Sequence, residues 1–305
     1  MRTLLAPLGA ALLLLAGTAQ AAGPSVVVSI KPLHSLVAGV TQGVSEPELL
    51  LAAGDSPHTY AMRPSEARAV RGADLIVHIS PHMETFLEPA LAGHDDARSV
   101  LTAARLDGVE VIGPRQSHSS GHDTGSGHRD GHRRDYHLWL DPDNAQAITT
   151  AVAERLAALD PEHAETYRDN AEAQRARIEA LDERLRQRLE PVQGEPYVVF
   201  HDAYRYFERH YGLEAVGAVT LNPHQPPGAG HLQELRERIR ELGAVCVFSE
   251  PQFEPAIVRS LVNGLDARSG ALDPLGTDLE AGPDAYFKLL EGLADSFRAC
   301  LLETG

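Results

Sequence analysis

The segment from Pro161 to Leu189 constrains the fold most strongly, because it predicts one helix long enough to run beside two lobes. It has no glycine and no internal proline, and it is crowded with the good helix formers Ala, Glu, Arg and Gln. Its apolar residues Ile178, Leu181, Leu185 and Leu189 fall on one face. A helix of these 29 residues would be about 43 Å long. We therefore expect one long rigid helix over residues 161–190 to join two halves of the chain.

On each side of this segment, short runs rich in Val, Ile and Leu alternate with helical patterns. This alternation predicts parallel strands covered by helices on both faces. The expected strands lie at residues 26–30, 48–51, 74–79 and 109–112 in the first half, and at 197–200, 215–219, 244–248 and 269–272 in the second. We expect one α/β lobe over residues 22–160 and another over residues 191–305.

The first 21 residues have the pattern of a cleavable export signal. Arg2 precedes an apolar stretch of 14 residues from Leu4 to Gly17, and a small-x-small sequence ends at Ala21. The stretch is shorter than the roughly 20 residues that span a bilayer, and no cysteine follows it to carry a lipid anchor. No later segment is long and apolar enough to span. We expect a soluble, exported mature protein.

The composition predicts a globular protein that does not bind nucleic acid. Hydrophobic residues make up 43% of the chain and charged residues 23%, so it can bury one or two cores. Asp plus Glu number 43 against 27 Lys plus Arg, a formal net charge of -16. A surface of that sign is not built to neutralise nucleic-acid phosphates.

The chain has only two cysteines, Cys246 and Cys300. After export both would sit in an oxidising compartment, where a disulfide is the expected state. Such a bond would contribute about 4 kcal/mol on the chain-entropy model. A pair of buried thiols is the alternative.

Residues 113–136 form a segment of a different composition. Its 24 residues include five glycines and four histidines but no Val, Ile, Leu, Met or Phe. Such a segment cannot bury enough apolar surface to offset the entropy of ordering it, so we expect a mobile loop. Neutral imidazole is a good ligand for zinc and copper, although a merely solvated insertion is the alternative. The candidate auxiliary, weak metal ligands are His118, His122, His128 and His132.

Three other histidines lie where ordered elements are expected to end or begin. His201 directly follows a predicted strand, at the carboxyl end where open α/β sheets place their ligand sites. His58 lies in the loop after the strand at 48–51, and His137 opens the ordered sequence after the mobile loop. A lone histidine is more often a surface or core residue than a ligand. These three form one site only if the two lobes face each other.

Five motifs in order along the chain resemble those of the metal-binding solute-binding proteins of ABC importers, and most of all the zinc-binding, ZnuA-type branch. The motifs are Ser-Pro-His-Thr-Tyr-Ala-Met-Arg-Pro-Ser, His-Leu-Trp-Leu-Asp-Pro, Phe-His-Asp-Ala-Tyr-Arg-Tyr-Phe, Ser-Glu-Pro-Gln-Phe and Leu-Asp-Pro-Leu-Gly. The resemblance covers essentially the whole mature chain, with the histidine-rich insertion in the expected place.

The resemblance implies two lobes, each with a four-stranded, mainly parallel sheet flanked by helices, with metal bound in the cleft between them. It implies a monomeric periplasmic protein that binds Zn²⁺ as cargo, has no enzymatic activity, and delivers the ion to an inner-membrane ABC permease with its cytoplasmic ATPase. Contact with the membrane would be through that complex alone. By motif position, the implied zinc ligands are His58, His137 and His201, with Asp273 as a possible fourth.

One departure from the family pattern bears on the ligand set. Some zinc-binding members carry a ligating Glu immediately before the first histidine, whereas this chain has Pro57. The fourth ligand is then Asp273 or a water. Manganese-binding members place a carboxylate where His201 stands, and an imidazole there favours zinc-like metals. The resemblance also pairs Cys246 with Cys300.

Two other classes of protein share such a site. Three histidines and a water also describe a catalytic zinc centre, so a zinc-dependent hydrolase is one alternative. Glu250 and Asp202 would be its candidate general bases, although an acid beside a ligating histidine is as often a partner that orients the ring. An exported zinc buffer or adhesin without a transporter is the other alternative.

Overall fold

A computed structural model describes residues 23–51, 54–92, 99–113, 115, 134–220, 227–253 and 256–302. The predicted export signal and the four histidines of the histidine-rich segment (His118, His122, His128 and His132) lie outside these residues. Within the described residues, no helix is long and apolar enough to cross a membrane.

Each lobe is built on a four-stranded parallel sheet, as predicted. In the amino-terminal lobe the order is β2-β1-β3-β4, with β1 at Val26–Val28, β2 at Glu48–Leu49, β3 at Leu75–His78 and β4 at Val100–Thr102. In the carboxyl-terminal lobe the order is β6-β5-β7-β8, with β5 at Tyr197–His201, β6 at Ala215–Thr220, β7 at Cys246–Ser249 and β8 at Arg268–Ala271. The second sheet thus repeats the strand order of the first.

The prediction of a strand at residues 109–112 is wrong, because the fourth strand of the first sheet is β4. The backbone N–H of Glu110 donates to a side chain of the helix that follows (2.7 Å), and that of Ile112 donates to the hydroxyl of Tyr206 (3.0 Å). These N–H groups are directed to side chains, so the segment does not extend the sheet. Its apolar side chains still pack against the core, which explains why the pattern resembled a strand.

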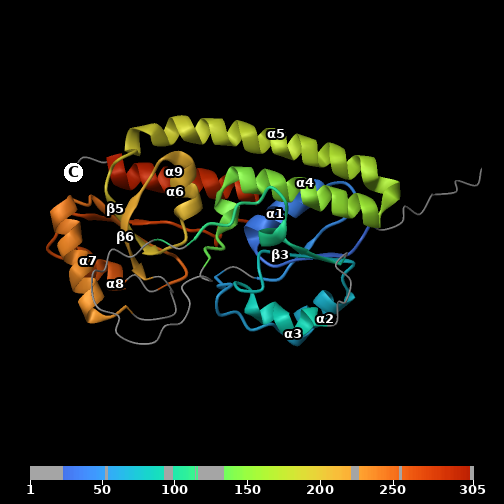
Figure 1. Ribbon diagram of the computed structural model, residues 1–305, viewed down its shortest axis with the longest axis horizontal. Helices are drawn as coiled ribbons and strands as arrows, with labels where there is room; N and C mark the ends of the chain where they lie inside the picture. The colour runs from blue at the N-terminus through green and yellow to red at the C-terminus, as the bar shows by residue number, and fades with distance from the viewer. Residues whose placement is uncertain are drawn as a thin grey trace, which may run out of the picture.

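Helices connect and cover the strands (Figure 1). They are α1 at Lys31–Val40, α2 at Pro64–Gly72, α3 at Glu88–Leu91, α4 at Pro142–Leu159, α5 at Ala164–Leu189, α6 at Arg205–Tyr211, α7 at Ala229–Leu242, α8 at Ala256–Val262 and α9 at Ala285–Leu302. Local sequence fixes the starts of α2 and α4, each of which has proline at its first position. The Glu66 carboxylate accepts from the N–H of Arg63 (2.7 Å), and Asp141 accepts from that of Asp143 (2.9 Å).

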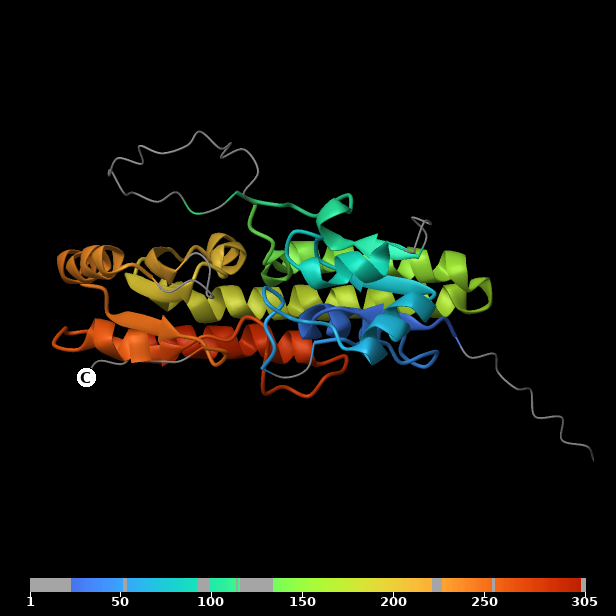
Figure 2. The same cartoon turned by 90° about the horizontal axis from the view of Figure 1, so that it is seen from below.

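The long helix α5 runs beside both lobes, as the sequence predicts (Figures 1 and 2). It packs against α4 and α1 of the first lobe and against α6 and α9. Gly39 of α1 permits a close approach to α5, because a Cβ there would overlap the Gln174 side chain. The Gln174 amide in turn donates to the carbonyl of Leu36 (2.8 Å). One apolar core therefore continues from the first lobe through α5 into the second.

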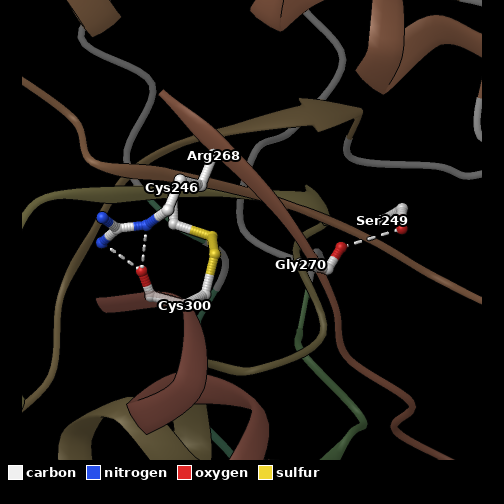
Figure 3. Close-up of a disulfide and its surroundings, with 5 residues drawn as sticks. All are labelled: Cys246, Ser249, Arg268, Gly270 and Cys300. Atoms are coloured by element: carbon white, nitrogen blue, oxygen red, sulfur yellow. Dashed lines mark hydrogen bonds between the residues drawn. A yellow bond between two sulfur atoms is a disulfide. The ribbon is translucent and has the colours of Figure 1, made fainter. Parts of the chain in front are cut away.

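A disulfide joins Cys246 at the start of β7 to Cys300 in α9 (Figure 3). The guanidinium of Arg268 donates through Nε to the carbonyl of Cys300 (2.8 Å). Gly270 leaves room for the bond, because a Cβ there would lie 3.1 Å from the Cys300 sulfur and 2.7 Å from the ring of Phe248. The disulfide expected from the sequence is therefore present, and it fixes the last helix to the second sheet.

Candidate metal centre

Three histidines from distant parts of the chain meet where the two lobes face each other. His58 lies in a turn after β2, and His137 directly precedes the 3-10 turn Leu138–Leu140 that leads into α4. His201 is the last residue of β5. The first lobe thus supplies two imidazoles and the second lobe one.

The three rings form a compact triangle. The centroid distances are 5.4 Å for His58–His137, 5.4 Å for His58–His201 and 4.7 Å for His137–His201. One nitrogen of each ring lies within 4.8 Å of the others. Nitrogens that bind one tetrahedral zinc at about 2.0–2.1 Å lie about 3.3 Å apart, so small ring movements bring these three into coordination distance.

Two buried carboxylates orient two of the rings. The Asp135 carboxylate accepts from the backbone N–H of His137 (3.0 Å) and lies 2.8 Å from its Nδ1. The Glu250 carboxylate lies 3.3 Å from Nδ1 of His201. With Nδ1–H donating to a carboxylate, Nε2 of each ring is left as a lone-pair donor for a metal.

The surroundings set different pKa values for the two oriented histidines. Burial and the neighbouring His201 hold the pKa of His137 well below its usual range. Burial also acts to lower the pKa of His201, but the carboxylates of Glu250, Asp135 and Asp202 together outweigh it, so that the pKa of His201 is raised. Burial raises the pKa of Asp135 to about 6. The centre thus combines a neutral imidazole with one that readily takes a proton.

The cavity at the histidines has the size of an ion. Its volume of about 10 Å³ is close to that of a single water-sized sphere. Besides the histidines and Glu250, it is lined mainly by apolar side chains, including Met83, Trp139, Phe253 and Leu275. The Trp139 indole also donates to the carbonyl of Pro274 (2.8 Å), a direct bond between the lobes.

Asp273, the possible fourth ligand, is not among the residues whose ligand atoms come together. Its carboxylate accepts from the N–H groups of Leu275 (3.0 Å), Gly276 (3.1 Å) and Thr277, and from the amide of Gln252 (2.7 Å). These bonds stabilise the turn that follows Asp273.

A second group of possible metal ligands in the described residues comprises Asp141, Asp143 and His210. The nitrogens of His210 lie 3.3 Å from an Asp141 oxygen and 2.7 Å from an Asp182 oxygen. Burial lowers the pKa of His210, but these carboxylates raise it to about 9. The imidazolium stabilises the fold below its ordinary pKa, and the contribution is lost as the pH rises through about 9. This group is an ion-pair network with both ring nitrogens engaged.

Two α/β lobes joined by a helix, with imidazoles from both lobes around an ion-sized cavity, define a two-lobed metal-binding protein of the solute-binding class. Residues 26–300 match the family described as ZnuA, the periplasmic component A of a zinc-uptake complex. The chain belongs to this family. It is 40% identical over 304 residues to the high-affinity zinc uptake system protein ZnuA of Brucella abortus, with 90% of this chain and 91% of that protein covered.

Solved structures share the fold. A ZnuA deletion mutant with zinc bound superposes with a TM-score of 0.77 at 24% identity, covering 93% of this chain and 100% of that one. The periplasmic zinc-binding protein TroA of Treponema pallidum gives 0.75 at 23% identity, covering 92% of this chain and 99% of that one.

Asp135, the partner of His137, was not predicted from the sequence. Asp135 stands two residues before His137, much as Asp202 stands next to His201. An acid close to a candidate ligand was therefore an available signal. Glu250, considered as a base or an orienting partner, lies in the orienting position.

Proposed function

We propose that the protein captures Zn²⁺ in the periplasm and delivers it to an inner-membrane ABC permease with its cytoplasmic ATPase. The observation that carries this proposal is the convergence of His58, His137 and His201 on one ion-sized cavity, in a chain of the ZnuA family. Zinc is the cargo. Because both lobes supply ligands, binding and release of the ion are coupled to the relation between the lobes.

The donor set favours zinc on chemical grounds. Three neutral imidazoles suit zinc better than they suit the hard cations Mg²⁺ or Ca²⁺. A divalent ion also compensates the buried carboxylates of Asp135 and Glu250, which are 8% and 3% exposed. We propose water as the fourth ligand, because the Asp273 oxygens already accept several hydrogen bonds, from their own turn and from Gln252.

Transport without catalysis fits the cavity better than hydrolysis does. A zinc hydrolase needs room for a substrate beside its metal-bound water, whereas this cavity accommodates about one water-sized sphere. We propose that the protein is not an enzyme. Zinc-loaded protein should release no product from ester, peptide or phosphate substrates above the rate of free zinc.

We also propose that residues 1–21 are cleaved as an export signal, that the protein is a monomer, and that it contacts the membrane only through the permease. Metal analysis of untagged protein recovered from the periplasm tests the cargo, with one zinc per chain expected. Deletion of the gene should slow growth in low zinc only when the permease is present. A defect independent of the permease would instead favour a zinc buffer or adhesin.

Below about pH 6, zinc affinity is expected to fall by about one to two orders of magnitude for each unit by which the pH is lowered. His201, with its raised pKa, takes up a proton, and Asp135, with a pKa of about 6, becomes neutral. A protonated His201 and a neutral Asp135 both hold zinc less well. His137 adds little in this range because its pKa is lowered. Competition with a calibrated zinc chelator at pH 7, 6 and 5 measures the slope, and a constant affinity would contradict a histidine centre.

Removing the histidine-rich segment is expected to leave one tight zinc site and to remove weaker ones. The sequence predicts a loop whose glycine-spaced histidines are not preorganised, so metal bound there would also have to order the chain. The deletion should span Ser117–Arg133, because Arg134 donates to the carbonyl of Val111 (2.8 Å). Calorimetry on the intact and shortened proteins counts the sites. Loss of the tight site would mean that the segment supplies essential ligands. In the intact protein we propose that it collects or senses abundant zinc.

A further inference from the structure

The two ends of the histidine-rich segment meet in a short structure that we call the stem, made of Ile112, Gly113, Arg115 and Asp135. The backbone N–H of Asp135 donates to the carbonyl of Ile112 (3.0 Å), so the chain returns to the point at which it left. The stem belongs to the first lobe by sequence. Several of its other hydrogen bonds are with the second lobe.

Tyr206 of α6 connects the second lobe to both ends of the stem through one hydroxyl group. The hydroxyl accepts from the N–H of Ile112 (3.0 Å) and donates to the carbonyl of Asp135 (2.7 Å). Tyr206 is 1% exposed, so these bonds are shielded from water. The hydroxyl thus satisfies a buried donor and a buried acceptor that lie on different arms of the stem.

Two arginines strengthen the same junction. Arg115 of the stem donates to Asp202 (2.8 Å) and to the carbonyl of Ala215 (3.0 Å), and it pairs with the buried carboxylate of Glu208. In the opposite direction, Arg205 of α6 donates to the carbonyl of Gly113. The position of the stem on α6 is therefore fixed by several independent bonds.

The stem leads directly to the metal centre. Asp135, whose carbonyl Tyr206 holds, uses its carboxylate to accept from the backbone N–H of His137 and to contact Nδ1 of its ring. Asp135 is thus the one residue between the Tyr206 hydroxyl and the His137 ring, which it links through hydrogen-bonded contacts on each side. A movement of the Asp135 backbone would carry the carboxylate, and with it the imidazole, away from the position that faces His58 and His201.

We propose that Tyr206 is a positioning residue of the zinc site, which holds Asp135 across the lobe boundary and thereby orients His137. A ligand of the first lobe is then aligned by a side chain of the second. The site is preorganised only while the stem rests on α6. This inference rests on the proposed function.

The test is the variant Tyr206→Phe, which removes one hydroxyl and retains the ring. Its zinc affinity is expected to fall about tenfold, because loss of the hydrogen bond to its carbonyl frees Asp135 and hence the ligand it orients. The absorption bands of bound Co²⁺ should shift as the geometry of the site changes. Tyr286→Phe is the matched control, since the Tyr286 ring is buried and its hydroxyl has no hydrogen-bond partner among the described residues. It should keep both the affinity and the spectrum.

A double-mutant cycle separates positioning from general destabilisation. If Tyr206 acts through Asp135, Tyr206→Phe should change zinc affinity less than about threefold in an Asp135→Ala background. An equal loss in both backgrounds, or unchanged affinity of Tyr206→Phe alone, would overturn the inference. If Tyr206→Phe does not fold, Arg205→Ala carries the test in the same two backgrounds. Absence of a tight site in the wild-type protein would instead refute the proposed function.

Discussion

Replacing His201 with alanine is expected to weaken zinc binding by more than about 100-fold. Loss of a hydrogen-bonded partner behind a ligand already costs about 10- to 100-fold, and here the ligand itself is lost. His201 is also the imidazole that the second lobe contributes, at the end of β5. Its removal leaves two ligands on one lobe and nothing to hold the ion against the other. Competition with a chelator of known affinity measures the loss.

His231→Ala is the matched control for this prediction. His231 lies in α7 of the same lobe, where a ring nitrogen contacts the carbonyl of Ala218 (3.1 Å). Its removal should leave zinc affinity unchanged. Wild-type affinity in His201→Ala, with one zinc still bound per chain, would refute the assignment of the site.

Replacing both Cys246 and Cys300 with alanine is expected to lower the free energy of unfolding by about 4 kcal/mol and the melting temperature by about 10 °C. The bond closes a loop with a sequence separation of 54 and holds α9, which packs against α1 and α5 as well as against β8. Denaturant unfolding and calorimetry measure the two changes.

Zinc affinity should be nearly unaffected by the same double variant. Cys246 pairs in register with Tyr197, the first residue of β5, whereas His201 is the last residue of that strand. The disulfide and the ligand therefore lie at opposite ends of the parallel strands. Wild-type protein treated with a thiol reductant should lose the same stability. An unchanged unfolding midpoint in both preparations would contradict a stabilising bond.

Much of the fold could be predicted because it rests on local patterns. Residues 161–189 specify a helix through composition alone, and runs such as 197–200 are apolar enough to be buried on both faces. His201 could be assigned to a strand end for the same reason. The fourth strand of the first sheet was predicted at the wrong place. The true strand, Val100–Thr102, is short, and residues 109–112 are equally apolar. The N–H groups of residues 109–112 bond to distant side chains instead of to a strand, which the sequence does not reveal.

The parts that could not be predicted depend on contacts between residues far apart in the chain. The sequence separation is 87 between Arg115 and Asp202, and 71 between Tyr206 and Asp135. No periodicity or short motif links such pairs. The engagement of the Asp273 carboxylate in its own turn is local by contrast, but it depends on backbone geometry that its motif does not reveal.

X-ray absorption at the zinc edge tests the central claim most directly, on protein that lacks Ser117–Arg133 and holds one zinc per chain. Three imidazoles from two lobes predict about three nitrogen neighbours and one oxygen at about 2.0–2.1 Å, with the outer-shell scattering of imidazole rings. The same measurement on His201→Ala should show one ring fewer. A first shell of oxygens with at most one imidazole, or one unchanged by that substitution, would contradict the account.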